Sequence, residues 1–141
     1  MDLLERNKAT VRRVFAEGFG EGRLDVVDEA LAPDAVDRHP FEPDEPDFRA
    51  HLKGAIAMFR AAMPDLSAHV EDIVAEGDRV AVRVRMTGTH TGAPLFGIAA
   101  AGRPVDIEQF HFIQSDADGR GLRHWANVGA DDLLRQVRQP G

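Results

Sequence analysis

The hydrophobic residues in the first half of the chain recur with the spacing of an α-helix. Apolar side chains follow this period in residues 4–19, 24–31 and 48–63, which predicts three amphipathic helices. Asp47 stands just before the third segment, where its side chain can accept a hydrogen bond from the first helical turn. We therefore expect each helix to present one apolar stripe to a common core.

Strands are expected in the second half, where apolar residues alternate with polar ones. The segments with a period of two cover residues 66–75, 79–86, 105–114 and 122–128. A Gly-rich loop at residues 87–102 separates the second strand from the third, and residues 131–137 return to helical spacing. Upstream, residues 35–39 predict a short extended segment, and the prolines in residues 40–46 predict an exposed loop.

Helices followed by a run of antiparallel strands are typical of the α+β class. This order predicts helices packed on one face of a curved antiparallel sheet. No internal repeat, linker or low-complexity tract divides the chain, so residues 1–141 are expected to form a single domain. The 43% hydrophobic and 29% charged content is that of a globular protein with one core.

Composition narrows the range of functions. No apolar run approaches the ~20 residues of a membrane-spanning helix, and the N-terminal segment lacks the pattern of a secretory signal, so we expect a cytoplasmic protein. A formal net charge of -7 argues against binding nucleic acid. Cysteine is absent, which excludes disulfides and thiolate chemistry. Lysine and serine are scarce and tyrosine is absent, so chemistry is expected from His, Asp, Glu, Asn or Gln.

Histidine is the residue type best suited to chemistry in this chain. The six histidines are His39, His51, His69, His90, His111 and His124. Alternation along residues 105–114 places His111 on the same face as Gln109, and His124 lies on the strand that follows. Because a turn joins these two strands, we expect His111 and His124 to point into one cavity.

Two histidines in a semi-apolar cavity are candidates for general acid/base catalysis, because imidazole titrates near neutrality. A hydrogen-bonded structural role is the alternative for each. The sequence has no H-E-x-x-H motif and no close histidine pair on one helix face, so we expect no metal site. The glycines of residues 88–92 do not follow a strand and open a helix, which argues against a phosphate-binding loop.

Other residues are candidates for the wall of such a cavity. His39 could line its mouth or cap a loop, and His51 shares the apolar stripe of the third helix. Large apolar side chains form either a plain core or a pocket wall, and these are Phe15, Phe19, Met58, Phe59, Met63, Phe96 and Trp125. Phe110 and Phe112 lie opposite His111 on their strand, so we expect this strand to be buried on both faces.

Several short motifs resemble those of the SnoaL-like polyketide cyclases. In chain order they are Ala62-Met63-Pro64-Asp65-Leu66, Glu76-Gly77-Asp78-Arg79-Val80, Gly88-Thr89-His90-Thr91-Gly92, Phe96-Gly97-Ile98, Gly102-Arg103 and His124-Trp125. Their order and spacing agree from the N-terminal helix to Leu133-Leu134-Arg135-Gln136. The resemblance is carried by this succession rather than by any single motif.

This resemblance implies a cone formed by a curved antiparallel sheet with helices packed on it, which encloses a deep apolar pocket. It also implies self-association, as a homodimer or homotetramer. The family's characterised cyclases use no metal or organic cofactor, and they close the last ring of anthracycline-type aromatic polyketides by intramolecular aldol condensation. His111 fits the family's pocket histidine, so we expect it to serve in acid/base catalysis, with His124 in support, on a multi-ring aromatic substrate.

One position departs from the cyclase pattern. Ala126 stands where the catalytic carboxylate is expected, and alanine cannot transfer a proton. A hydroxylase-like tailoring enzyme, which could use a partner reductase, is therefore as well supported as a cyclase. A non-catalytic binding or scaffold domain and an isomerase or dehydratase of small substrates are the alternatives. The residues expected to contact the substrate are His39, His51, Phe15, Phe19, Phe59, Met63, Gln109, Trp125, Ala126 and Asn127.

Overall fold

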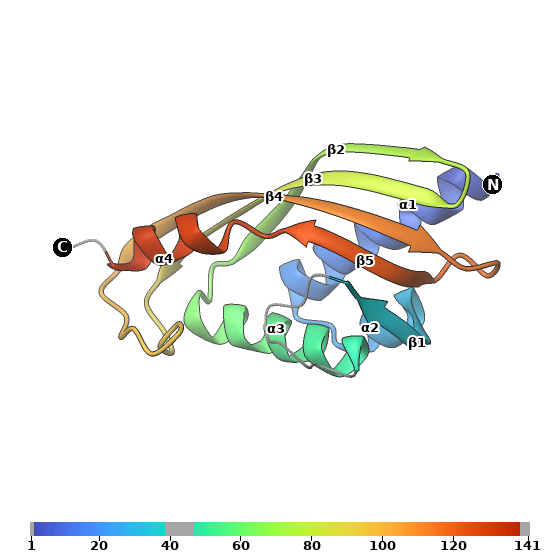
Figure 1. The fold of residues 1–141 in the computed structure, drawn as a ribbon. Coiled ribbons are helices and arrows are strands. Elements are labelled where there is room, and N and C mark those ends of the chain that lie inside the picture. The colour runs from blue at the N-terminus through green and yellow to red at the C-terminus, as the bar shows by residue number, and fades with distance from the viewer. Residues whose placement is uncertain (1, 39–46, 139–141) are drawn as a thin grey trace.

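The computed structural model describes residues 2–38 and 47–138. Its elements are α1 (Leu3–Arg13), the π-helix η1 (Val14–Phe19), α2 (Asp25–Ala30), β1 (Leu31–Asp37), α3 (Phe48–Ala62), β2 (Ser67–Glu76), β3 (Arg79–His90), β4 (Arg103–Ser115), β5 (Gly121–Asn127) and α4 (Ala130–Arg138). The sheet arches over α1, α2 and α3, which all lie on one side of it (Figure 1). The expected α+β class, a curved sheet with helices on one face, is confirmed.

The sheet has five strands in the order β1-β5-β4-β3-β2. The pairs β2–β3, β3–β4 and β4–β5 are antiparallel, as expected. Strand β1, however, pairs parallel with β5, so the expectation of a purely antiparallel sheet is wrong at this edge. The direction differs because β1 follows α2 and joins the sheet from a distant part of the sequence rather than through a hairpin.

Strand β3 is longer than its alternating hydrophobic pattern. It was expected to end at residue 86, but it continues through Gly88 and Thr89 to His90, which pairs with Arg103 at the start of β4. Asp65 supports this extension, because its carboxylate accepts hydrogen bonds from the Thr89 backbone N–H and hydroxyl. The glycine in this stretch therefore lies within a paired strand rather than in the expected loop.

The expected first helix changes its winding at Val14. Residues Leu3–Arg13 are α-helical, and Val14–Phe19 form a π-helix, in which hydrogen bonds span five residues. Phe15 and Phe19 are both buried here, and their rings stack with centroids 5.9 Å apart. Gly18 lies close to α3, since a Cβ atom there would be 3.2 Å from Cδ1 of Ile56. The π-helix thus presents two aromatic rings to the interior.

Helix α3 is defined at both of its ends. The Asp47 side chain accepts a hydrogen bond from the Ala50 backbone N–H, as the sequence predicts for a capping residue. At the other end, the backbone N–H groups of Gly92 and Ala93 donate to the carbonyl oxygens of Ala62 and Ala61, at 2.9 Å each. These bonds satisfy carbonyls that a helix C-terminus leaves without a partner. The loop after β3 is thereby fixed to the end of α3.

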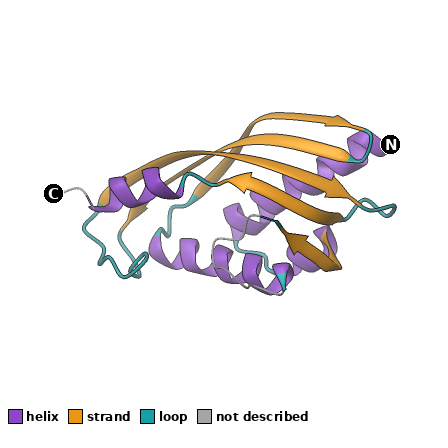
Figure 2. Cartoon of the chain, viewed as in Figure 1, coloured by secondary structure: helices purple, strands orange, loops and turns teal. Residues whose placement is uncertain are grey.

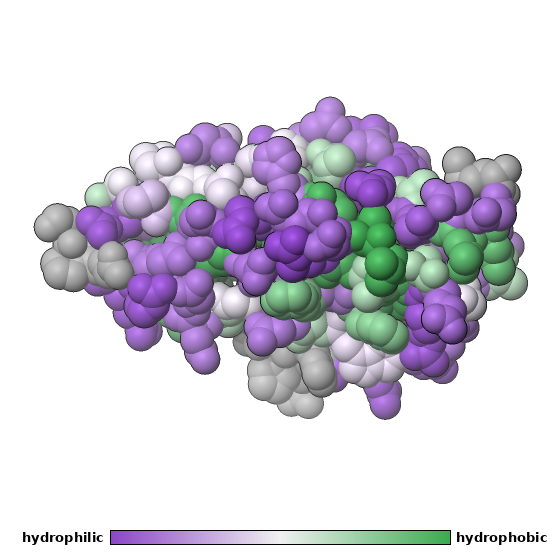
Figure 3. Space-filling view, turned by 90° about the horizontal axis from the view of Figure 1, so that it is seen from above, coloured by the Kyte–Doolittle hydropathy of each residue, from purple (hydrophilic) through white to green (hydrophobic). Residues whose placement is uncertain are grey.

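Helices α1, α2 and α3 lie on the concave side of the sheet and α4 lies beside β4, so helices leave the outer face of the sheet uncovered (Figure 2). Phe110 and Phe112 are 51% and 41% exposed on this face, and the expectation that β4 is buried on both faces is wrong. Alternation along a strand separates two faces, but it does not show which of them the helices cover. Viewed from above, hydrophobic residues lie among hydrophilic ones (Figure 3).

Candidate active site

The concave face of the sheet and the helices beneath it enclose a cavity of about 660 Å³. Its wall is mainly apolar, and the large hydrophobic side chains that line it are Val11, Val14, Phe15, Phe19, Leu31, Phe48, Leu52, Met58, Phe59, Phe96, Ile113 and Leu133. A volume of this size is within the range of pockets that bind small organic ligands. The described helices include none that is long and apolar enough to cross a membrane.

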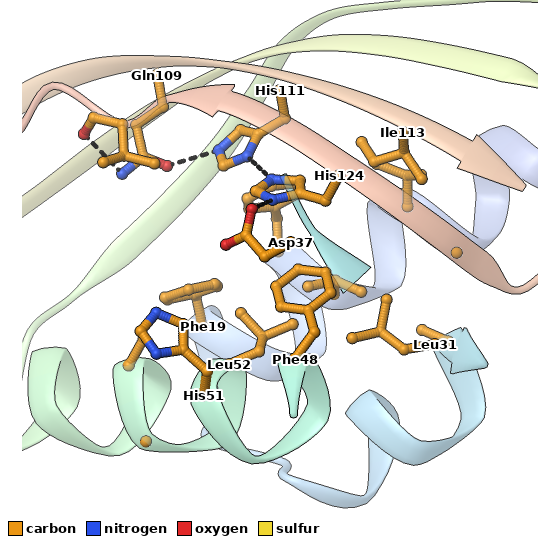
Figure 4. Close-up of a pocket in the computed structure, with 18 of the residues that line it drawn as sticks. Phe19, Leu31, Asp37, Phe48, His51, Leu52, Gln109, His111, Ile113 and His124 are labelled. Carbon is orange, nitrogen blue, oxygen red and sulfur yellow. Dashed lines mark hydrogen bonds and ion pairs between the residues drawn. The ribbon is translucent and has the colours of Figure 1, made fainter. Parts of the chain in front are cut away.

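Four polar side chains form a hydrogen-bonded chain on the sheet side of this cavity (Figure 4). Gln109 Oε1 lies 2.9 Å from His111 Nε2, and His111 Nδ1 lies 2.8 Å from His124 Nε2. His124 Nδ1 in turn lies 3.0 Å from Asp37 Oδ1. The chain crosses from β4 to β5 and ends on β1, so three strands of the sheet contribute to it.

The register of the strands explains why the two histidines meet. Ile113 pairs with His124 and His111 pairs with Ala126, so both histidines lie on the inner face as diagonal neighbours. Aromatic rings then enclose them. The Phe15 ring lies 5.0 Å from that of His111, and the Phe48 ring stacks on His124 at 5.0 Å with an interplanar angle of 21°. The expectation that His111 and His124 point into one cavity is confirmed.

His111 is neutral in this environment. Burial, the larger cause, and the neighbouring His124 together lower the pKa of His111 to about 3, although Asp37 acts in the opposite direction. A neutral imidazole carries one N–H, so one of its nitrogens donates a hydrogen bond and the other accepts one. Both nitrogens of His111 are already engaged, with Gln109 and with His124.

Asp37 is the one member of this hydrogen-bonded chain that was not among the candidate site residues predicted from the sequence. Its side chain is only 7% exposed and that of His124 is 13% exposed, so this carboxylate–imidazole contact is largely shielded from water. The sequence offered one signal, because Asp37 falls in the segment expected to be extended. Its approach to His124 depends on the parallel pairing of β1 with β5, which local patterns do not reveal.

The cavity brings together both candidate catalytic histidines and half of the residues expected to contact a substrate. Those on its wall are Phe15, Phe19, His51, Phe59, Gln109, His111 and His124. His51 comes from α3, on the side opposite the histidine chain (Figure 4). His39 lies outside the described residues.

Four of the expected contact residues lie elsewhere. Met63 follows the end of α3 and is buried in the core against Gly88. Trp125 lies on the outer face of the sheet, where its ring packs on Phe112 with centroids 6.0 Å apart. Asn127 pairs with the outward-facing Phe110. Ala126 pairs with His111 on the inner face, but it is not among the residues that line the cavity.

The remaining histidines are separate from this site. His90 is fully buried at the end of β3, and its Nε2 lies 2.9 Å from the carbonyl oxygen of Ala93. His69 is exposed on β2. Within residues 2–38 and 47–138, no group of three or more His, Cys, Asp or Glu side chains is placed to hold a metal ion. Asp37 contacts His124 and His124 contacts His111, so their polar atoms bond to one another instead of pointing at a common position where a metal ion could lie.

Comparisons with known proteins agree with this architecture. The sequence profile described as SnoaL-like polyketide cyclase matches residues 9–139. A comparison with proteins of curated function gave no match. Among solved structures, a proposed SnoaL-like polyketide cyclase from Jannaschia sp. CCS1 is 25% identical, with a TM-score of 0.84 over 100% of this chain and 97% of the other.

Two Streptomyces structures are also similar to the chain. IdmH, a proposed polyketide cyclase from Streptomyces antibioticus, is 30% identical, with a TM-score of 0.77 over 93% of this chain and 97% of IdmH. AclR, a proposed hydroxylase from Streptomyces galilaeus, is 26% identical, with a TM-score of 0.78 over 98% of this chain and 85% of AclR.

Proposed function

Because the chain belongs to the SnoaL-like polyketide cyclase family, we propose that it is a cofactor-independent enzyme that closes a ring of a multi-ring aromatic polyketide by intramolecular aldol condensation. The observation that carries this proposal is the Asp37–His124 pair at the wall of a large apolar cavity. The apolar wall suits flat aromatic rings, and the pair supplies a group that can take up and return a proton.

The Asp37–His124 pair also answers the difficulty raised by Ala126. A cyclase of this kind needs a proton-transferring group, and alanine at position 126 provides none. Asp37 brings a carboxylate to the same region of the cavity from a different strand. In our proposal Asp37 therefore replaces the carboxylate that the cyclase pattern places after the His-Trp pair.

In the proposed reaction the pair starts with one proton and exchanges it for another. The enol form of the acidic carbon between two carbonyl groups of the substrate attacks a ketone carbon of the same molecule, which forms a C–C bond and moves the electrons of the ketone π bond to its oxygen. The pair gives its proton to this oxygen and takes up the proton that the enol releases, so the product has the same composition as the substrate. The cavity holds the two reacting carbons close together.

Residue roles follow from the hydrogen bonds. Asp37 and His124 are the proposed proton-transferring pair. His111 holds the His124 ring in place, because both of its nitrogens are engaged in the chain and its pKa is low. His51, on the facing wall, is proposed to contact a polar group of the substrate. Phe15, Phe19 and Phe59 are proposed to pack against its rings.

A hydroxylase-like activity is the second candidate. Two observations favour it, namely alanine at position 126 and the similarity to AclR. Such a reaction inserts one oxygen atom from dioxygen into the substrate, and two electrons from a reductant, such as a partner reductase, convert the other oxygen to water. An enzyme of this kind needs the cavity and its hydrogen-bonding groups, but it does not need a carboxylate at position 126.

One experiment separates these activities. The purified protein is incubated with a tricyclic anthraquinone that carries a β-keto ester side chain, in air and with a reductant, and the products are analysed by mass spectrometry. A cyclic product of unchanged mass supports the aldol cyclase. A product heavier by one oxygen atom supports the hydroxylase. Saturable binding without any product supports a binding domain, and conversion of only small ketones supports an isomerase or dehydratase.

The outer face of the sheet is proposed to join two copies of the chain. Phe110 and Phe112 are both exposed on this face, and Arg79 lies over the rings of Phe112 and Trp125. Arg83 bonds both Asp72 and Glu108 beside them, so this face carries both signs of charge. A second copy could therefore bury the aromatic side chains while its charges find opposite partners.

A further inference from the structure

Gln109 determines which atoms donate and which accept in the hydrogen-bonded chain from Gln109 through His111 and His124 to Asp37. The Gln109 side-chain amide has two different ends, a donor NH₂ group and an acceptor oxygen. Its Nε2 lies 3.1 Å from the backbone carbonyl oxygen of Val128, which can only accept. The NH₂ group must therefore face Val128, and the amide oxygen must face His111. With 4% of its surface exposed, Gln109 has little contact with water that could replace these partners.

This orientation determines the tautomer of His111. Since Gln109 Oε1 only accepts, His111 Nε2 must carry the proton. A neutral His111 then has no proton on Nδ1, so Nδ1 accepts a hydrogen bond from His124 Nε2–H. The reverse direction would require either a doubly protonated His111, which burial opposes, or a rotated Gln109 amide whose oxygen faces the oxygen of Val128.

The same reasoning continues to Asp37. With its Nε2 proton donated to His111, His124 faces Asp37 Oδ1 through Nδ1. If neither atom carried a proton, two acceptors would meet at 3.0 Å in a shielded site, which is unfavourable. One proton must therefore lie between His124 and Asp37, either on the imidazolium or on the carboxylic acid.

We propose that Gln109 is a positioning residue: anchored on the Val128 carbonyl, it holds His111 in the Nε2–H tautomer and thereby keeps one transferable proton on the His124–Asp37 pair. Without this anchor, His111 is able to adopt the Nδ1–H tautomer and donate to His124, which then donates its own Nδ1–H to the Asp37 carboxylate. That alternative chain is fully hydrogen-bonded with one proton fewer. The catalytic role of the proton on the His124–Asp37 pair rests on the proposed function, but the proposed tautomer of His111 does not.

Nitrogen NMR of the isotope-labelled protein without substrate tests this proposal. Long-range proton–nitrogen spectra distinguish protonated from bare ring nitrogens, and the signals that disappear in His111→Gln and His124→Gln assign the two rings. Near neutral pH we expect His111 to show a protonated Nε2 and a bare Nδ1. A Gln109→Leu substitution should shift His111 toward the Nδ1–H tautomer. Gln114→Leu, on the same strand but bonded to Asp78, should leave these signals unchanged.

Two results would overturn the proposal. One is a His111 that carries its proton on Nδ1, or on both nitrogens, in the unmodified protein. The other is a Gln109→Leu protein that folds and keeps the same His111 signals. If Gln109→Leu does not fold, the spectrum of the unmodified protein still decides. Since no substrate is used, a protein that fails to cyclise polyketides can still show the proposed tautomer, so the two proposals fail separately.

Discussion

Asp37 and His124 lie 87 positions apart in the sequence, yet Asp37 Oδ1 and His124 Nδ1 are only 3.0 Å apart. The contact joins the first strand of the chain to the last, and the parallel pairing of β1 with β5 makes it possible. It places a carboxylate at the cavity of a protein whose expected catalytic position holds alanine.

The contact predicts that Asp37→Asn reduces turnover by about 100-fold or more, because the amide keeps the shape of the side chain but cannot share the proton. The measurement is kcat/KM for the anthraquinone β-keto ester. Asp34→Asn is the matched control, since Asp34 is exposed on the same strand. Full activity in Asp37→Asn would remove Asp37 from the proposed mechanism.

The low pKa of His111 predicts a stability that depends on pH. The folded protein keeps His111 neutral down to about pH 3, whereas the unfolded chain takes up a proton below about pH 6.5. The free energy of unfolding should therefore fall as the pH decreases through this window, by roughly 1 kcal/mol per pH unit from this group. Urea unfolding of the unmodified protein at several pH values measures the decrease.

A His111→Gln protein should lose this contribution, because glutamine does not titrate. Its free energy of unfolding should decrease less between about pH 6 and about pH 4 than that of His69→Gln, in which the exposed His69 is replaced. Contributions from Asp and Glu side chains are common to both proteins and cancel in the difference. Equal slopes in the two proteins would show that His111 is not kept neutral by the fold.

The cavity volume predicts selection by size. Ala55 lines the cavity from α3, and Ala55→Phe would fill part of it, so binding of the tricyclic anthraquinone should weaken by about 10-fold or more. Ala57→Phe is the control, because Ala57 is exposed on the same helix. Titration followed by quenching of the Trp125 fluorescence or by calorimetry gives the dissociation constants. Equal affinity in the two variants would place the ligand outside this cavity.

The close contact between the loop after β3 and the end of α3 predicts that a side chain at Gly92 strongly destabilises the folded protein. A Cβ atom at this position would lie 2.0 Å from the carbonyl oxygen of Ala61, so Gly92→Ala must displace the loop from the end of α3. We expect a loss of about 3 kcal/mol in the free energy of unfolding. Gly54→Ala should instead add about 1 kcal/mol, because it lies within α3 and its new methyl group meets no atom within 4 Å. Denaturant unfolding of both variants checks the opposite signs.

The proposed interface on the outer face of the sheet predicts that a charge placed there weakens the association of two copies of the chain. Phe112→Asp should shift the protein toward the monomer, because it places a charge among the exposed aromatic side chains. Leu24→Asp is the control, since Leu24 is also exposed but precedes α2, away from this face. Light scattering after size-exclusion chromatography measures the molar mass. An unmodified protein that is already monomeric would contradict the proposed interface.

Local patterns predicted most of the helices and strands, since periods of 3.6 and 2 are properties of short segments. Alternation also placed His111 and His124 on the inner face of neighbouring strands, because a short turn joins them. The position of Asp37 and the direction of β1 could not be obtained in this way, since both depend on how distant segments meet. The exposure of Phe110 and Phe112 was misjudged for a similar reason: a strand pattern does not specify what covers each face.

Strand β1 lies at the edge of the sheet, and its pairing with β5 is interrupted by a register shift between Leu31 and Val36. Edge segments with interrupted pairing open more readily than the centre of a sheet. Local detachment of this strand would carry Asp37 away from His124 while β2 to β5 remained paired. Loss of the proposed proton-transferring pair therefore does not require global unfolding, and we expect the lifetime of the Asp37–His124 contact to follow that of the pairing of β1 with β5.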